Sequence, residues 1–296
     1  MAKVIEAEPS IELAVFSGDM MTGLNIDKNA SAYLKRLAGV TSSLGVPHTM
    51  ILGNHDAEPF SGTGKNQSSP GAYLSRQAIV EYDAALPLSF TEVGPSELFP
   101  AVSVYVVDVF RREGELQTQT QARAPALQLF HLDSGGGGMP EQLHVEQVVW
   151  FNKTISSRRK SFNGTIVPAL VFVHIPLFEF QDAIKNEKRC FGDHDDGITP
   201  TLENTGLFLA LDAAPEVMAV FVGHDHCNDF CCSWGKREVE LCFGRHSGYG
   251  GYTCPGYPEG SRIISYNEST GFLETHVRLN GNLSVVHKKR IAIRLR

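Results

Sequence analysis

Short apolar runs that alternate with segments of helical spacing constrain the fold of this chain most strongly. Apolar residues recur at helical spacing in "NASAYLKRLAGVTSSLG" and again across residues 139–160, and each segment is flanked by β-branched runs. Such alternation predicts βαβ units, closed here by an antiparallel hairpin that turns at "NGN". The sequence therefore predicts an α/β fold. The expected strands lie within residues 11–19, 47–56, 102–110, 126–135, 168–178, 216–226, 238–244 and 261–267.

Length and charge exclude several classes of protein. The chain has 296 residues, of which 42% are hydrophobic, and no repeat or linker interrupts it, so we expect one domain over residues 1–296. Its net charge of −7 argues against binding to nucleic acids or anionic membranes, and the short basic run "HKKR" is expected to be a solvated tail. No apolar stretch is as long as a membrane span, and the opening "MAKVIEAEPS" lacks the apolar region of a signal peptide.

Sequons and cysteines nonetheless indicate the secretory pathway. Half of the asparagines lie in N-x-S/T sequons, namely Asn29, Asn66, Asn152, Asn163, Asn267 and Asn282. The cysteines are even in number and clustered near the end of the chain, at Cys190, Cys227, Cys231, Cys232, Cys242 and Cys254. We therefore expect a disulfide-bonded glycoprotein that is secreted or held in an endomembrane or vacuolar compartment. Buried free thiols in a cytosolic protein are the alternative, and the sequence leaves the pairing open.

Four of the expected strands end in polar side chains, which a buried core strand does not need. They are Asp19, Asn54, His55, His174, His224 and His226. In open α/β sheets, sites assemble beyond the carboxyl ends of strands. Carboxylate, amide and imidazole groups suit Mn, Fe or Zn, although each residue taken alone could be a turn cap or a satisfied core histidine. Together these residues predict a metal site.

The H-x-H pair and the loops around the predicted ligands add to this interpretation. Side chains at i and i+2 of an extended segment point the same way, so His224 and His226 are expected to converge, with Asp225 turned aside. Two long polar segments, residues 54–73 and 178–200, begin near candidate ligands and are expected to be functional loops.

The motifs G-D, G-N-H-D, V-x-H and G-H-D-H, in this order, resemble those of the calcineurin-like metallophosphoesterase superfamily. The longer strings "FSGDMMTG", "LGNHDAE", "HIPLFEF", "GHDHCNDFC" and "CFGRHSGYGGY" are most similar to its purple-acid-phosphatase-like branch in plants and fungi. The resemblance covers nearly the whole chain. It implies a two-layer β sandwich flanked by helices, which holds two metal ions and cleaves phosphate esters.

The resemblance also implies a ligand for each ion. Asp19 would bridge the two ions, Asn54, His174 and His224 would complete the first site, and His226 would bind the second ion. Paired ions of this kind clamp a phosphate ester and activate water for its hydrolysis. The metals expected are Fe, Mn or Zn.

His55 would not be a ligand in this scheme. By the same resemblance it would stabilise the phosphoryl oxygens or protonate the leaving alkoxide, with Asp56 orienting its ring. One departure from the family lies at Thr22, where the purple enzymes have a tyrosine, so no purple colour is expected. A second departure is that no Asp-x-His motif precedes Asp19.

The missing motif bears on the start of the chain. The opening residues read as the tail of a crossover helix, so we expect a first strand and a signal peptide to be missing from an N-terminally incomplete domain. The second ion is then left with two protein ligands, Asp19 and His226, and this chain is expected to be a poor catalyst.

Three functions are consistent with the motifs. The first is a dinuclear metal phosphatase acting on phosphomonoesters. The second is a catalytically impaired relative that acts as a binding protein, and the third is a phosphodiesterase with the same fold. The physiological substrate, and the variable loops that would contact it, cannot be identified from the sequence.

Overall fold

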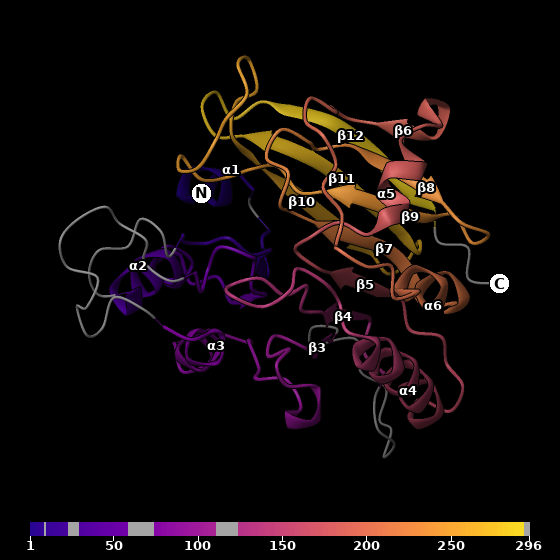
Figure 1. Cartoon of the computed structure of the whole chain (residues 1–296). Helices are drawn as coiled ribbons and strands as arrows, with labels where there is room; N and C mark the ends of the chain where they lie inside the picture. Colours follow the sequence, from indigo (N-terminus) through magenta and orange to yellow (C-terminus); the bar gives the residue numbers. More distant parts are fainter. Residues whose placement is uncertain (9, 23–29, 59–73, 111–123, 293–296) are drawn as a thin grey trace.

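A seven-stranded mixed sheet crosses the centre of the computed structural model, which describes residues 1–8, 10–22, 30–58, 74–110 and 124–292. In spatial order its strands are β3 (Tyr105–Val109), β4 (Leu127–His131), β5 (Ala169–Phe172), β7 (Val217–Val222), β9 (Val239–Phe243), β8 (Cys231–Trp234) and β6 (Cys190–Phe191). Strands β4, β5, β7 and β9 pair in parallel, whereas β3 and β8 run antiparallel to their neighbours (Figure 1).

A second layer covers one face of this sheet. It consists of the parallel pair β1 (Ala14–Phe16) and β2 (His48–Met50) and of the antiparallel strands β10 (Gly260–Asn267), β11 (Phe272–Leu279) and β12 (Val285–Ala292). Side chains of both layers share one buried cluster, in which Ile51, Leu273 and Ile291 join Leu129 and Phe221 of the large sheet. This arrangement confirms the predicted two-layer sandwich, with a second layer that is divided into two sheets.

Helices cover the outer faces of the sandwich (Figure 1). The helices are α1 (Ala2–Ala7), α2 (Ala30–Ser43), α3 (Arg76–Ala84), α4 (Val145–Ser161), α5 (Phe178–Ala183) and α6 (Leu207–Ala213), with short 3₁₀ turns η2 (Ser96–Leu98) and η3 (Glu187–Arg189). Phe151, Phe180 and Leu211, one from each of α4, α5 and α6, pack against the large sheet. Leu34 and Ile79 pack α2 and α3 against the β1–β2 pair.

Local sequence explains where these elements begin and end. Leu34, Ala38 and Thr41 are buried at helical spacing along one side of α2, which links parallel β1 and β2 as a βαβ unit. The Ser75 hydroxyl accepts the backbone N–H of Ala78 at 3.2 Å and caps α3. The same βαβ arrangement recurs with α4 between β4 and β5, as the alternation of patterns predicts.

Three disulfides confirm the predicted oxidised state of the cysteines. They pair Cys190 with Cys232, Cys227 with Cys254, and Cys231 with Cys242. The first joins β6 to β8 and the third joins β8 to β9, so two of the three staple neighbouring strands at one edge of the large sheet.

Two expectations about this part of the chain are wrong. Residues 178–200 do not form one long loop, because they contain α5 and the edge strand β6. The basic run at residues 287–290 is not a solvated tail but part of β12, where Lys289 pairs with the buried Glu240 at 3.1 Å. In both places tertiary pairing determines the structure, and local composition does not reveal it.

The sequon asparagines within the described residues lie at the surface, as glycosylation requires. Asn29 and Asn66 lie outside the described residues, as do residues 59–73 of the first polar segment. The other sequon asparagines, Asn152, Asn163, Asn267 and Asn282, are all exposed. No helix in the described part of the chain is long and apolar enough to cross a membrane.

Candidate metal centre

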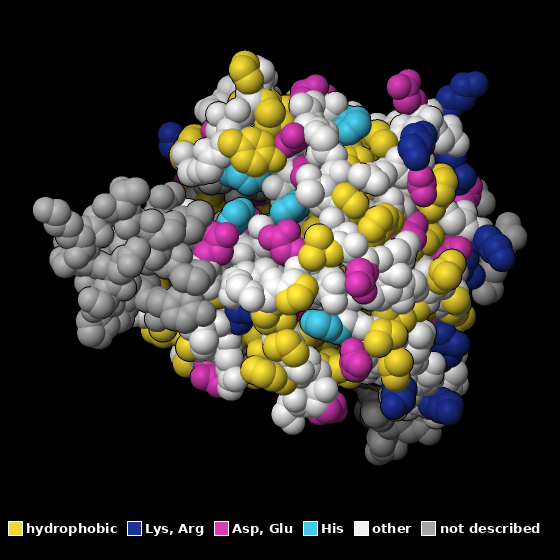
Figure 2. All heavy atoms as spheres, viewed as in Figure 1, with side chains coloured by type: hydrophobic (Ala, Val, Ile, Leu, Met, Phe, Trp, Pro, Cys, Tyr) yellow, Lys and Arg dark blue, Asp and Glu magenta, His cyan; other side chains and the backbone are white. Residues whose placement is uncertain are grey.

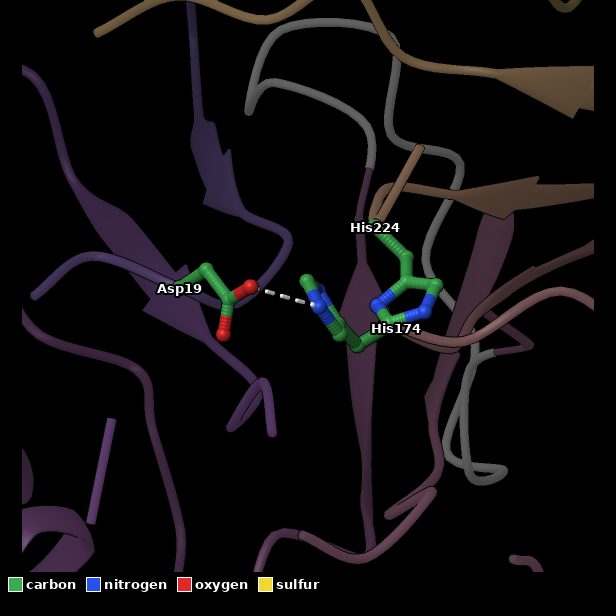
Figure 3. A group of neighbouring side chains, drawn as sticks. All are labelled: Asp19, His174 and His224. Carbon is green, nitrogen blue, oxygen red and sulfur yellow. Dashed lines mark ion pairs between the residues drawn. The ribbon is translucent and has the colours of Figure 1, made fainter. Parts of the chain in front are cut away.

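Three predicted ligands meet where the strands of both layers end (Figure 3). Asp19 follows β1, His174 follows β5 and His224 follows β7, and their ligand atoms all lie within 4.8 Å of one another. The three side chains point toward a common centre from segments that are far apart in the sequence. Asn54, which follows β2, contributes its amide oxygen to the same group.

The polar atoms of this group lie close to one another. Nε2 of His174 lies 3.1 Å from Asp19 Oδ2 and 3.1 Å from Asn54 Oδ1. Nδ1 of His224 also lies 3.1 Å from Asn54 Oδ1. The second nitrogen of His174, Nδ1, is 2.7 Å from the Ser17 carbonyl oxygen and donates to it, so a neutral His174 ring presents Nε2 as the ligand atom.

The donor set fits a first-row transition metal. One carboxylate, one amide oxygen and two imidazoles are ligands that Mn, Fe and Zn accept. Asn54 and His174 are 5% and 2% exposed, so these polar atoms face one another with little access to water. A bound cation would satisfy such convergent lone pairs, which otherwise face one another.

The charges of Asp19 and His174 shift the pKa values of the ligand group. Burial alone would raise the pKa of Asp19, but the charge and hydrogen bond of His174 outweigh it and hold this pKa well below its usual range. Burial opposes protonation of His174, but the Asp19 carboxylate raises its pKa. Burial, followed by the charge of His174, lowers the pKa of His224 to about 4. His224 is therefore neutral near pH 7, as a metal ligand must be.

Backbone conformation places these ligands under strain. Asp19 and His224 are non-glycine residues with φ of +52° and +72°, in the sparsely populated left-handed region. A side chain at Gly53 would lie 2.1 Å from Asp19 Oδ1, and one at Gly18 would lie 2.5 Å from His174 Nδ1. Both glycines are required because the backbone approaches the ligands closely.

The structure gives His55 a partner that was not predicted. Its Nδ1 lies 2.7 Å from Glu58 Oε2, and its backbone N–H donates to Asp19 Oδ1 at 2.9 Å. Burial would lower the pKa of His55, but the hydrogen bond of Glu58 and the charge of Asp19 raise it. The ring is thus oriented by Glu58, a role that the sequence interpretation gave to Asp56.

Asp56 acts on the backbone of the metal loops instead. Its carboxylate accepts N–H groups of Asp19 at 2.9 Å, Met21 at 3.0 Å and Gly53 at 2.7 Å. Burial, followed by the charge of Asp19, raises the pKa of Asp56 to about 6. These three hydrogen bonds tie the loops after β1 and β2 together, and Asp56 itself is buried, with only 2% of it exposed.

A second carboxylate missed by sequence reasoning orients Asn54. The Asn54 amide nitrogen donates to Glu141 Oε1 at 2.9 Å, so the amide oxygen must turn toward the two histidines. Glu141 is held in place through its own carbonyl oxygen, which accepts the N–H of Leu202 at 2.9 Å. No sequence pattern links residues so far apart, and no local signal could have identified this contact.

A buried arginine supports the same loop from below. The guanidinium of Arg76 pairs with Asp133 and donates to the carbonyl oxygens of Gly53 at 3.3 Å, Gly135 at 2.9 Å and Gly136 at 3.2 Å. The glycine-rich segment, residues 135–138, thereby packs against the loop that carries Asn54. This buried ion pair fixes two metal-site loops to each other.

His226 does not join the first three ligands. His224 has a left-handed φ of +72°, so the H-x-H segment is not fully extended, and the group within 4.8 Å consists of Asp19, His174 and His224. The ring of His226 stacks between His246 and Tyr252, with centroids 4.2 Å and 4.0 Å away. Its Nδ1 lies 2.7 Å from the Tyr252 carbonyl oxygen, to which it can donate, leaving Nε2 for an ion.

Two other side-chain clusters with metal-ligand composition do not fit an ion. Asp196 lies beside Cys227 and Cys254, but these sulfurs form a disulfide and cannot act as thiolates. Asp229 and its neighbours Asp193 and His287 already surround a cation, because Arg245 Nη1 lies 2.6 Å from Asp229. Among the described residues, the group at Asp19 is therefore the metal-site candidate.

Comparison with known proteins agrees with this geometry. No family model matches the sequence. The chain is 28% identical over 276 residues to "Probable inactive purple acid phosphatase 29" of Arabidopsis thaliana, covering 89% of this chain and 66% of that protein. It is 28% identical over 271 residues to "Probable inactive purple acid phosphatase 14" of the same plant, covering 86% and 62%. It is also 27% identical over 289 residues to "Phosphatase DCR2" of Saccharomyces cerevisiae, covering 92% and 46%.

These relatives match nearly the whole chain, whereas the chain spans about two thirds or less of their lengths. The motifs that carry the predicted ligands and the sandwich that positions them are consistent with this relationship. The chain is thus a homologue of the purple-acid-phosphatase-like proteins of the calcineurin-like metallophosphoesterase superfamily, which confirms the resemblance seen in its motifs.

Proposed function

We propose that the protein is a metal-dependent phosphomonoesterase with a dinuclear centre. The observation that carries this proposal is the position of Asn54 Oδ1, 3.1 Å from nitrogen atoms of both His174 and His224, in a group completed by Asp19. A catalytic ion is held by about three protein ligands and keeps a position open for water or substrate, which this donor set can supply. Relatives with "phosphatase" in their names support the reaction class.

The residues of the chain divide the work of binding. Asn54, His174 and His224 would hold the first ion, Asp19 would bridge the two ions, and His226 would hold the second. When bound, the ions would polarise the phosphate ester and make water more acidic. Fe, Mn and Zn all suit this donor set.

His55 supplies the proton in this proposal. Its side chain is 42% exposed, so it can reach a leaving group, and Glu58 at 2.7 Å keeps the ring oriented. The raised pKa of His55 keeps its ring protonated toward neutral pH. A protonated imidazole at this position donates to the leaving alkoxide and completes hydrolysis.

A non-catalytic binding function is the second candidate. One observation favours it: plant relatives are named "probable inactive". A phosphodiesterase would use the same centre with a different leaving group.

One assay separates these functions. The full chain is loaded with Mn or Zn, and its turnover is measured on an aryl phosphate monoester and on the matching diester. We expect faster metal-dependent hydrolysis of the monoester. Faster hydrolysis of the diester would instead identify a phosphodiesterase. Bound metal with no turnover on either substrate would identify a binding protein.

We propose in addition that the protein follows the secretory route. Three disulfides are compatible with an oxidising compartment, and four sequon asparagines are exposed. Treatment with a deglycosidase should increase the gel mobility of protein taken from its native source. Unchanged mobility would contradict glycosylation and remove this support for the route.

A further inference from the structure

A groove with a surplus of positive charge lies at the edge of the sandwich where β6 and β8 face β12. Its volume is about 420 Å³, and it is open to solvent. Five basic and two acidic side chains line it, within a chain whose net charge is −7. The basic side chains are Lys188, Arg189, Arg237, Lys289 and Arg290. Figure 2 shows Lys and Arg concentrated on the right side of the molecule, away from most of the histidines.

The groove is separate from the candidate metal centre. His224 follows β7 in the middle of the large sheet, whereas β6 is the outermost strand on one side of that sheet. The turn between β8 and β9 carries Arg237 and Glu238 at the amino end of β9. Because β9 runs parallel to β7, that end is opposite to the end at which His224 lies.

Covalent and ionic contacts fix the walls of the groove. The Cys190–Cys232 disulfide joins β6 to β8 and so holds the segment that carries Lys188 and Arg189. Arg189 pairs with Glu238 at 2.6 Å, and Lys289 pairs with Glu240 at 3.1 Å. The two glutamates therefore hold basic side chains in place while their own charges are neutralised.

The surplus positive charge points outward. Lys188 and Arg290 are exposed. Glu274, 2.7 Å from Arg290, offsets part of the Arg290 charge, but this pair is at the surface and the Arg290 side chain stays 61% exposed. Several cations spread along an open groove attract an extended polyanion. A single small anion instead binds best in an enclosed site where several donors converge. The ligand class is therefore a polymer with repeated negative charges.

We propose that this groove binds an acidic polysaccharide, whose carboxylate or sulfate groups pair with Lys188, Arg290 and their basic neighbours. A single-stranded nucleic acid fits less well, because such ligands stack bases on exposed aromatic rings. The aromatic ring that lines the groove, Phe191, is covered by the Lys289 ammonium group at 4.5 Å. Three disulfides also favour an oxidising compartment, where acidic glycans are available.

The test compares two double variants of the full chain. Lys188→Ala/Arg290→Ala removes two exposed charges from the groove, and Lys153→Ala/Lys160→Ala removes two exposed charges from α4. Binding to heparin and to polygalacturonate is measured over a range of salt concentrations, with single-stranded DNA of similar length as the competing class. Thermal unfolding and metal content are measured on the same preparations to confirm that both variants are folded.

We expect the wild-type chain to bind at least one of the two polysaccharides at low salt. The groove variant should lose about tenfold in affinity and about two units of the slope of log K against log salt. The α4 variant should change affinity by less than about twofold, because its charges lie elsewhere. Equal losses in the two variants, or no binding by the wild-type chain, would overturn the proposal. Tighter binding of DNA, with the same dependence on the groove, would also overturn it in favour of a nucleic acid.

Discussion

The amide nitrogen of Asn54 donates to Glu141 at 2.9 Å, while its amide oxygen faces His174 and His224 at 3.1 Å each. The orientation of one proposed ligand, Asn54, thus depends on a carboxylate that is not itself a proposed ligand. Partners of this kind commonly tune metal sites, because they fix which atom of the ligand faces the ion.

Replacement of Glu141 should therefore weaken metal binding. We expect Glu141→Ala to lower the affinity for Zn or Mn by about 10- to 100-fold, and Glu141→Gln, which keeps an acceptor oxygen, to lower it less. Equilibrium dialysis measures the affinity, with Glu146→Ala on exposed α4 as the control. Wild-type affinity in Glu141→Ala would show that Asn54 is oriented without it.

Glu58 should control the pH dependence of turnover through His55. The pKa of His55 is raised, since the Glu58 hydrogen bond and the Asp19 charge outweigh burial. A raised pKa keeps the ring protonated to higher pH. Glu58→Gln lowers that pKa, so the alkaline limb of the kcat profile should move to lower pH, whereas Glu146→Gln should leave it in place. An unmoved limb in Glu58→Gln would contradict the role of His55 as the acid.

His131, a buried histidine outside the candidate ligand group, should make the fold sensitive to acid. Burial lowers its pKa to about 3, and its Nε2 lies 3.0 Å from the Thr49 hydroxyl. The unfolded chain takes up this proton near pH 6.5, but the folded chain does not. Stability from this group is thus complete above pH 6.5 and is lost as the pH falls toward 3, by about 1.4 kcal/mol per pH unit.

Urea unfolding at several pH values tests this prediction. The variant His131→Gln should lose stability at pH 7.5 through poorer packing, but the free energy of unfolding should then fall less steeply between pH 6 and 4. An identical slope in the variant and the wild-type chain would show that His131 does not titrate on unfolding. The comparison isolates one group, since all other carboxylates and histidines are shared.

The disulfides should contribute unequally to stability. Cys190 and Cys232 are 42 residues apart, whereas Cys231 and Cys242 are 11 apart. Because a longer loop restricts the unfolded chain more, removal of the first should cost about 4 kcal/mol and removal of the second about 3 kcal/mol. Chemical denaturation of Cys190→Ala/Cys232→Ala and Cys231→Ala/Cys242→Ala measures the two costs. A larger cost for the second pair would contradict the chain-entropy explanation.

The sandwich strands and two helices could be predicted from the sequence because their signals are local. Strands β1, β2, β5 and β7 are apolar runs that end in Asp19, Asn54, His174 and His224, and the alternation with α2 and α4 determines parallel pairing. Strands β6 and β8 were missed. The segment Cys190–Phe191 is too short to form a pattern, and it pairs with β8 at a long-range disulfide.

The centre of the candidate site could be predicted, but its supports could not. Ligand types at strand ends carry a chemical signal, whereas Glu141 and Arg76 act across long stretches of sequence and look like ordinary surface or helix residues. The backbone conformation of His224 was missed for a different reason. A positive φ at His224, rare outside glycine, breaks the period of two on which the convergence of the rings was based.

The most direct test of the proposed centre is to measure metal content and hydrolysis together on His174→Ala, which removes its most buried ligand. His174 contacts both Asp19 and Asn54, whereas His194 is exposed and belongs to none of the candidate metal clusters. We expect His174→Ala to lose one bound ion and, with it, metal-dependent hydrolysis of an aryl phosphate monoester, while His194→Ala keeps both. If His174→Ala retained full metal content and wild-type turnover, the centre built on Asp19, Asn54, His174 and His224 would be wrong.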